Sequence, residues 1–328
     1  MRIGIALAAG GSVGVAYHGG VLAAIAEVTG WDARSAEVLV GTSAGSVTSA
    51  MVRAGVSASD LARISEGSPL SPEGSRLLSM GRPRRPKATA RQALGFRPVS
   101  DPKTLLRAVT CPGSVNAKAL LLACLPGGFI PTTALSEGID ALFGGSWPDE
   151  ALWLCSYDQR AGKRVVFGRP GAPRASVGAA VAASSAIPSH YAPVEIGGRQ
   201  YVDGGVHSML NLDVLSDAGL DLVLVVSPLT QASPWPVLTS TTVLRQFLGW
   251  QLRLEVANLR SKGVEVVVVQ PGRQAASAMG INPMDAARRG DVSRAARLEV
   301  SSWLRGQGSA TASRLRSEAI GSAASKAG

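Results

Sequence analysis

Cysteine and histidine are both scarce in this sequence. Its 328 residues include three cysteines and three histidines. Cys111, Cys124 and Cys155 show neither a paired spacing nor a CxxC motif, which excludes a disulfide framework and offers no ligand set for structural zinc. The sequence therefore fits a reducing compartment, and we expect neither a metal nor a cofactor.

Long apolar runs and a signal peptide are also missing. No run approaches ~18 apolar residues, so the sequence predicts no membrane-spanning helix. Residues 1–9 are apolar but carry Arg2 and run directly into glycines, which is typical of a buried first strand. A hydrophobic content of 46% and a charged content of 17% exclude global disorder. We expect a cytoplasmic protein, either free or peripheral to a membrane.

Negative charge is almost absent from one segment. The chain has a net charge of +10, and residues 76–107 hold nine Lys or Arg against one acid, Asp101. Such a segment indicates an anionic lipid surface or a nucleic acid as partner, or else a solvated loop. Phe96 is its one aromatic residue and no nucleic-acid-binding motif occurs, so we do not expect a nucleic-acid partner. The sequence gives no indication of the oligomeric state.

Strand-like and helix-like stretches alternate along the chain, which predicts a largely parallel sheet covered on both faces. The expected strands are Ile3–Ala8, Val38–Val40, Leu152–Tyr157, Arg164–Phe167, Gln200–Val202, Asp221–Ser227 and Val264–Gln270. The expected helices are Val15–Val28, Ala44–Ala54, Ser176–Ala186, Thr242–Arg260 and Met284–Leu304.

Residues 66–150 interrupt this alternation. Proline is dense there, which excludes long continuous helices, and we interpret the stretch as a cap inserted into one catalytic domain, 1–307. Within it, the apolar run 119–125 is either a buried helix of the cap or a lid element that touches lipid. The end of the chain, 308–328, is rich in Ala, Ser and Gly and is predicted to be a flexible tail.

A Gly-x-Ser-x-Gly pentapeptide, residues 41–45, directly follows the second strand. On a strand–turn–helix corner this pattern is a nucleophile elbow, with Ser43 held out at the end of the sheet. The turn is tight, so Gly41 and Gly45 are needed on either side. The alternative is an ordinary strand-to-helix turn that happens to contain a serine.

A glycine-rich loop, Gly10-Gly11-Ser12-Val13-Gly14, lies between the first strand and the first helix. Backbone N–H groups at such a helix start converge on an anion, either an oxyanion or a phosphate. Because Gly10 and Gly11 are adjacent, the loop is not GxGxxG, and no GK[ST] follows. A nucleotide site is therefore weakly supported.

A serine nucleophile also needs a base. His18, His190 and His207 are the three histidines, and none is a convincing base. Asp203 and His207 are only four residues apart, too close for the usual Ser, Asp, His order. Asp203 itself, at a strand end before Gly204-Gly205, is the better candidate, although an Asp-Gly pair is also an ordinary turn.

Taken together, the motifs resemble the patatin-like phospholipases, especially the bacterial ones. The resemblance covers roughly residues 3–227, and its blocks occur in order: Gly10–Gly14, Ala16–Leu22, Gly41–Gly45, Ala183–Pro188 and Asp203–Gly205. It implies a three-layer α/β/α sandwich and a serine lipid acyl hydrolase with a Ser–Asp dyad and no histidine.

Carried over residue by residue, the resemblance makes Ser43 the nucleophile and Asp203 the base. Gly10, Gly11 and Ser12 match the oxyanion-hole loop. Gly41, Gly45 and Gly204 would support the turns at these residues. The Ser184–Pro188 block would pack near the dyad. One departure is Val13, where the family's loop usually carries Lys or Arg.

The resemblance implies cleavage of fatty-acyl esters of phospholipids or lysophospholipids through an acyl-enzyme. A neutral-lipid lipase or general carboxylesterase is the close alternative. A catalytically weak patatin-like protein that binds membrane surfaces is the non-enzymatic alternative, supported by Val13 alone. The expected partners are a lipid substrate and, through residues 76–107, an anionic membrane surface.

Overall fold

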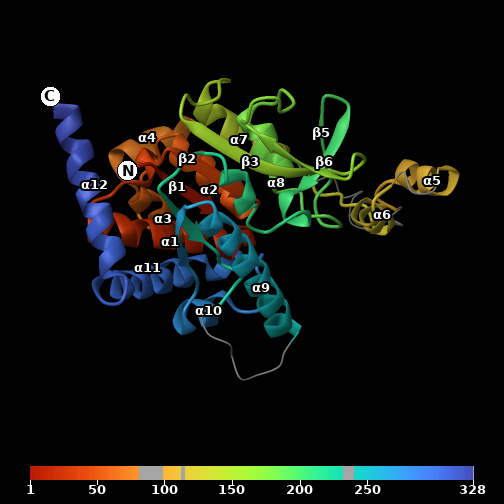
Figure 1. Ribbon diagram of the computed structural model, residues 1–328. Coiled ribbons are helices and arrows are strands. Elements are labelled where there is room, and N and C mark those ends of the chain that lie inside the picture. Colours follow the sequence, from red (N-terminus) through yellow and green to blue (C-terminus); the bar gives the residue numbers. More distant parts are fainter. Residues whose placement is uncertain (81–98, 112–114, 232–239, 328) are drawn as a thin grey trace.

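An eight-stranded sheet forms the centre of the protein, with strand order β5-β6-β3-β2-β1-β7-β8 and β4 paired to β3. The computed structural model describes residues 1–80, 99–111, 115–231 and 240–327 (Figure 1). The strands are β1 (Ile3–Leu7), β2 (Val38–Thr42), β3 (Ala151–Asp158), β4 (Lys163–Phe167), β5 (Val194–Ile196), β6 (Arg199–Asp203), β7 (Leu222–Val226) and β8 (Glu265–Val269). Strands β3, β2, β1, β7 and β8 are parallel, whereas β4, β5 and β6 join by antiparallel pairing.

The described α-helices connect and cover these strands. They are α1 (Gly11–Thr29), α2 (Ala44–Arg53), α3 (Ala58–Glu66), α4 (Pro72–Met80), α5 (Pro102–Thr110), α6 (Ala117–Cys124), α7 (Thr133–Phe143), α8 (Val177–Ser184), α9 (Ser240–Ser261), α10 (Arg273–Met279), α11 (Arg289–Arg305) and α12 (Ser309–Ala327). Short 3₁₀ turns include η3 (Gly204–Val206) and η4 (Leu212–Leu215).

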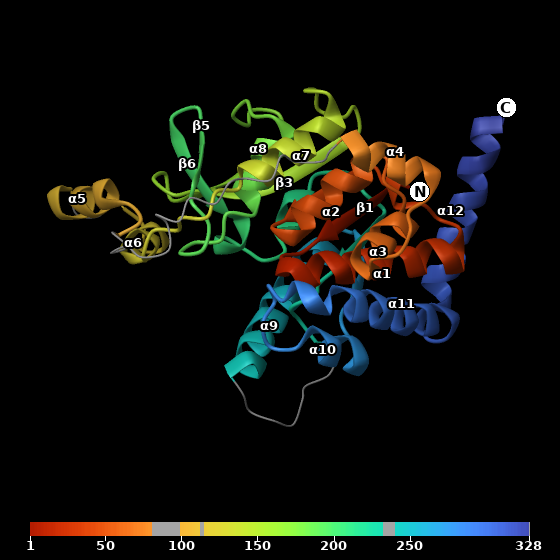
Figure 2. The same ribbon diagram turned by 180° about the vertical axis from the view of Figure 1, so that it is seen from behind.

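Side chains of β1 alternate between two separate apolar clusters, as the two-residue period of a strand requires. Ile3, Ile5 and Leu7 belong to a cluster with residues of α1, α3 and α11. Ala6 and Ala8 belong to a second cluster with residues of α9 and η4. Figure 2 shows α1, α2, α3 and α11 gathered on one side of the sheet. The predicted three-layer sandwich is confirmed.

Strand β3 brings β2 and β6 together at the carboxyl edge of the sheet. Thr42, the last residue of β2, pairs with Cys155. Asp203, the last residue of β6, pairs with the next residue of β3, Ser156. The segment after β2 and the end of β6 therefore meet at one point, although 160 positions separate Ser43 from Asp203 in the sequence.

The proline-dense region contains α4 to α7, each of which has at most 11 residues among the described parts of the chain. Helices α5 and α6 project from the body of the protein in both views (Figures 1 and 2). In α6, Ala119, Leu122 and Ala123 are buried, whereas Leu120 and Leu121 are exposed. Residues 81–98 of the basic segment lie outside the described residues, and the role of 66–150 as a cap stays a prediction.

Two helices bear on expectations from the sequence. Residues 309–327 form helix α12, although the sequence predicts a flexible tail there. Ala312 and Leu315 of this helix are buried against the body of the protein. Among the described helices, α1 has the length and apolar composition of a membrane-spanning helix. About two thirds of that window, 67%, is buried inside the protein, so α1 serves here as a core helix packed on α3 and α11.

Candidate active site

Ser43 lies in a strained backbone conformation at the start of α2. Its φ is 54° and its ψ −119°, outside the regions that residues with a Cβ favour. Gly41 and Gly45 make this turn possible. A Cβ on Gly41 would lie 2.5 Å from the Ser46 Cα, and one on Gly45 would collide with the Leu7 carbonyl. The predicted elbow geometry is therefore present: a strand, a tight turn and a helix.

Hydrogen bonds from the Ser184–Ser185 pair fix the backbone of Ser43. The Ser43 N–H donates to Ser184 Oγ at 3.0 Å, and Ser184 Oγ donates in turn to the Cys155 carbonyl at 2.6 Å. The Ser43 carbonyl accepts Ser46 Oγ at 2.6 Å and Ser185 Oγ at 3.4 Å. The segment after α8 thus lies against the elbow, where the resemblance expected the Ser184–Pro188 block.

Asp203 is buried beside Ser43 at the end of β6. Its carboxylate accepts the Gly205 N–H at 2.7 Å and hydrogen-bonds to the Ser43 side chain. Burial raises the pKa of Asp203 to about 6, and both hydrogen bonds oppose this rise. Gly204 leaves no room for a Cβ, which would collide with the Cys155 carbonyl. A carboxylate with this pKa is ionised at neutral pH, yet it accepts a proton more readily than an exposed aspartate.

Free backbone donors occur in the glycine loop. Gly11 has φ 62°, a left-handed conformation that favours glycine. The Val13 N–H donates to the Pro283 carbonyl at 3.1 Å, and the Gly14 N–H to the Gly10 carbonyl at 2.9 Å. Within the described part of the chain, the N–H groups of Gly11 and Ser12 have no acceptor. They lie at the start of α1, where an anion is favoured.

Val13 is buried, 1% exposed, and its aliphatic side chain carries no charge. A different cation lies near this loop. The half-buried Arg245 of α9 donates to the Pro228 carbonyl at 3.4 Å, and its pKa is lowered by burial. A Cβ on Gly10 would lie 2.5 Å from the Pro228 ring. Pro228 therefore lies between Arg245 and the glycine loop. No motif marks Arg245, so sequence reasoning missed it.

A groove of about 330 Å³ opens beside Ser43. No charged side chain is among the described residues that line it, which are Gly11, Ser12, Val15, Ser43, Ala44, Val47, Pro131, Thr132, Ala134, Leu135, Ser185, Ile187, Tyr191 and Met284. We call this cavity the Ser43 groove. Its walls come from α1, α2, α7 and three loops, and no spacing in the sequence indicates that these segments converge. A lining of this kind suits an apolar ligand.

The histidines do not reach Ser43. His18 is fully buried, contacts Thr48 Oγ1 at 3.4 Å, and burial lowers its pKa to about 3. The ring of His190 stacks edge-on against Tyr191. The pKa of His207 is lowered by partial burial and by Arg164. No hydrogen bond between a histidine and Ser43 occurs in the described residues, so Asp203 is the base candidate that the geometry brings to the serine.

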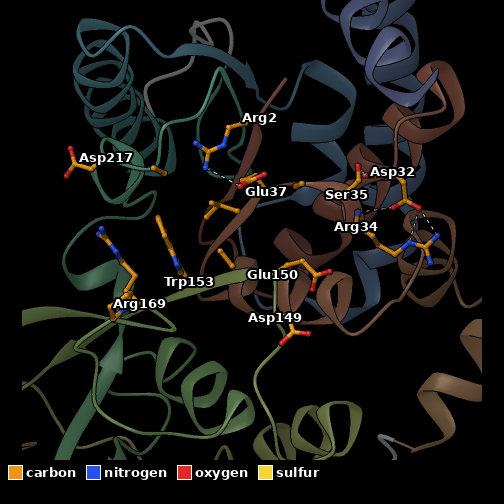
Figure 3. A pocket seen from close by; sticks show the side chains of 15 residues that line it. Arg2, Asp32, Arg34, Ser35, Glu37, Asp149, Glu150, Trp153, Arg169 and Asp217 are labelled. Atoms are coloured by element: carbon orange, nitrogen blue, oxygen red, sulfur yellow. Dashed lines mark hydrogen bonds and ion pairs between the residues drawn. The ribbon is translucent and has the colours of Figure 1, made fainter. Parts of the chain in front are cut away.

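A larger cavity, about 990 Å³, lies at the opposite edge of the sheet (Figure 3). Arg2, Val38 and Ala151, at the starts of β1, β2 and β3, line it. Its cationic side chains are largely engaged within the protein: Arg34 pairs with Asp32 at 2.6 Å, and Arg169 lies 4.6 Å from the ring centroid of Trp153. None of the predicted site residues lines this cavity.

The sequence matches a protein family over most of its length. The family model described as Patatin-like phospholipase matches residues 5–216. No curated protein matches the chain. A similar solved structure is VipD from Legionella pneumophila, 15% identical, with a TM-score of 0.44 over 92% of this chain and 67% of that chain. Because the family model covers well over half of the sequence, the chain belongs to the patatin-like phospholipases, a family of lipid acyl hydrolases.

Proposed function

We propose that this protein cleaves fatty-acyl esters of phospholipids or lysophospholipids with Ser43 as nucleophile and Asp203 as base. The observation that carries the proposal is the pairing of a strained, buried serine with a buried carboxylate whose pKa is raised to about 6. The uncharged Ser43 groove beside this pair supports an acyl chain as the bound part of the substrate.

In the proposed reaction, Asp203 accepts the proton of the Ser43 hydroxyl as its oxygen attacks the ester carbonyl. The free N–H groups of Gly11 and Ser12 hold the oxyanion of the tetrahedral intermediate. The alcohol leaves with the proton from Asp203, and the fatty acyl group stays on Ser43. Water, deprotonated by the same carboxylate, then releases the fatty acid.

An aspartate is a weak base, so its environment matters. With an ordinary pKa of ~3.9 it would hold a proton poorly. Burial raises the pKa of Asp203 towards the working pH, which lowers the cost of proton transfer in the transition state. The α2 N-terminus next to Ser43 also favours negative charge on the serine oxygen.

The test is a pair of serine variants on the same helix. Ser43→Ala should abolish both labelling by a fluorophosphonate and ester hydrolysis. Ser49→Ala is the matched control, because Ser49 is also buried in α2 and its hydroxyl has no partner among the described residues. This control should label and hydrolyse like the parent protein. Near-parental hydrolysis by Ser43→Ala would refute the assignment.

The alternative substrate class is a neutral lipid or simple carboxylic ester. It is favoured by the described lining of the Ser43 groove, which includes no cation to recognise a phosphate. Incubation with phospholipids, lysophospholipids and acylglycerols, followed by identification of the products, separates the two. Absence of labelling at Ser43 in the parent protein would instead support the weak, surface-binding alternative.

A further inference from the structure

The α5–α6 hairpin, residues 99–111 and 115–130, exposes large apolar side chains. Leu106 is 65% exposed, Val109 78% and Leu121 65%. These values are far above those of the leucines in the core, such as Leu122 of the same hairpin at 6%. In Figures 1 and 2 both helices stand away from the sheet.

The exposed charges of the hairpin are all positive. Lys103, Arg107 and Lys118 are exposed. Asp101 is its single acid, and this side chain is buried at the start of α5, where it accepts the N–H groups of Lys103 and Thr104 at 3.1 Å. The hairpin therefore offers a surface of aliphatic side chains and cations with no exposed acid.

Helix α9 shows the same combination independently. Phe247, Trp250 and Leu254 are 55%, 50% and 50% exposed, and their spacing places them on one face of the helix. Arg253 is exposed beside them. The nearest acid, Glu255, turns inward and accepts bonds from the Ser208 hydroxyl and, at 2.8 Å, the Leu212 N–H.

Both elements connect to segments that line the Ser43 groove. The chain leaving α6 reaches Pro131, which lines the groove. Met284 also lines it, and the nearby Ile281, 81% exposed, shares a small cavity with Leu248 of α9. In both views the hairpin projects beyond β5 and β6, and α9 projects below the sheet on the same half of the picture (Figures 1 and 2).

We propose that the α5–α6 hairpin and the exposed face of α9 together form a docking face for anionic phospholipid bilayers. Aliphatic and aromatic side chains insert at the interface, and the lysines and arginines contact anionic headgroups. Tryptophan beside arginine is the composition favoured at the membrane–water boundary. The absence of exposed acid on either element argues for a negatively charged surface rather than a protein partner of mixed charge.

The inference rests on the proposed function, because a lipid hydrolase must place its groove at the surface that holds its substrate. The basic segment 81–98 is not part of this inference, which assigns membrane binding to side chains of α5, α6 and α9. It also links the Ser43 groove to both contact points through the segments that line it.

The first test is co-sedimentation with phosphatidylcholine vesicles, with and without phosphatidylglycerol, at low and high salt. The parent protein should prefer the anionic vesicles, and salt should reduce this preference. Leu106→Ser and Leu121→Ser should each lower partitioning about tenfold, since insertion gains ~0.8 kcal/mol per buried CH₂. Ile320→Ser is the matched control, because Ile320 is 71% exposed on α12, away from this face. This control should bind like the parent protein.

The second test locates α9 in the bilayer. Brominated acyl chains quench a tryptophan that inserts among them. Quenching should be present in the parent protein and strongly reduced in Trp250→Phe, with the vesicle partitioning of the variant nearly retained. Equal quenching in both proteins would overturn the role of α9.

Hydrolysis of a soluble short-chain ester separates this proposal from the proposed function. The leucine variants should keep that hydrolysis and lose vesicle hydrolysis about tenfold. If Ser43→Ala leaves hydrolysis intact but the vesicle results hold, only the proposed function fails. The docking face would be overturned if both leucine variants partitioned into vesicles like the parent protein. It would also be overturned if the parent protein did not bind vesicles and formed a dimer through this face.

Discussion

Thr42 and Asp203 lie opposite consecutive residues of β3, Cys155 and Ser156. Strand β4 pairs with β3 along Leu154–Asp158, so β2 and β6 must share the other edge of β3. Because Ser43 directly follows Thr42, the register of the sheet brings the serine to the aspartate. The spacing of the two groups thus depends on buried strands rather than on a flexible loop.

The first prediction concerns the pH dependence of activity. The proposed base must be ionised, and burial raises the pKa of Asp203 to about 6. We expect kcat/KM for a soluble ester to be level above roughly pH 7 and to fall about tenfold per unit well below pH 6. His18, with its pKa lowered to about 3, does not titrate in this window. A rate that stays constant down to pH 5 would contradict the assignment of the base.

The second prediction is an opposite pH dependence of stability. Because the folded-state pKa of Asp203 is raised, the folded protein holds this proton between roughly pH 4 and 6 while the unfolded chain releases it. This contribution to the free energy of unfolding is therefore present at low pH and decreases as pH rises through 6. Its size is on the order of 3 kcal/mol, from about two pKa units.

Asp203→Asn is the variant that tests this linkage. Asparagine keeps the shape and carries no charge, so unfolding at neutral pH should need more urea while ester hydrolysis is lost about 10²-fold or more. Urea midpoints measured from pH 4.5 to 7.5 in both proteins give the difference. A midpoint difference that does not change with pH would show that Asp203 does not titrate in this range.

The third prediction concerns Ser184, whose hydroxyl joins the Ser43 N–H to the Cys155 carbonyl. In Ser184→Ala both backbone groups lose their partner, at a cost of about 1–3 kcal/mol in the free energy of unfolding. The elbow should also loosen, so kcat should fall more than KM rises. Ser49→Ala is the control, because Ser49 is also buried and its hydroxyl has no partner among the described residues. Equal effects of the two substitutions would argue against a specific role for Ser184.

Much of the sheet could be predicted because its strands are buried on both faces. The run Leu222–Val226 is apolar throughout and fully buried, as expected for a central parallel strand. The three-residue strand β5, Val194–Ile196, was missed, since it is too short for a pattern and lies at the edge. The predicted helix over 284–304 is shorter in the structure, where α11 begins at Arg289 after a 3₁₀ turn.

The candidate site, too, could be predicted only in part from the sequence. Local motifs could indicate Ser43 and the glycine loop, because each lies at a chain turn with a distinct signature. Asp203 lies in an ordinary Asp-Gly turn, so its prediction depended on the resemblance to the family. The walls of the Ser43 groove could not be predicted, since Leu135, Tyr191 and Met284 come from distant segments without such a signature. The exposed apolar face of α9 was also invisible, because a sequence does not tell which side of a helix is covered.

The fourth prediction compares two glycines with the same backbone conformation. Gly11 has φ 62° and Gly144 has φ 57°, so alanine at either position costs about 1 kcal/mol in backbone strain. A Cβ on Gly11 would also lie 2.5 Å from the Pro283 carbonyl oxygen, whereas one on Gly144 meets no atom within 4 Å. Gly11→Ala should therefore lower kcat at least tenfold by displacing the loop amides, and Gly144→Ala should leave kcat unchanged.

Thermal melts of these two variants supply the control for unfolding. Both should retain a cooperative transition, with a lower midpoint for Gly11→Ala because of the added collision. A Gly11→Ala protein that is folded and fully active would show that the glycine loop does not hold the oxyanion.

The fifth prediction concerns Arg245, a cation near the glycine loop. Arg245 lies against Pro228, which in turn contacts the glycine loop, and burial lowers the pKa of its guanidinium without removing the charge. A positive charge this near a developing oxyanion should stabilise it by roughly 1 kcal/mol, so Arg245→Gln should lower kcat for a soluble ester about fivefold with little change in KM.

Arg253→Gln is the matched control for Arg245→Gln, because it removes the same charge from an exposed position two turns along the same helix. On a soluble ester this control should behave like the parent protein, since water and salt screen an exposed charge. Raising the salt concentration should likewise leave the difference between the two variants intact, because the half-buried Arg245 is screened less. Equal kcat values for the two variants would show that the glycine loop works without help from Arg245.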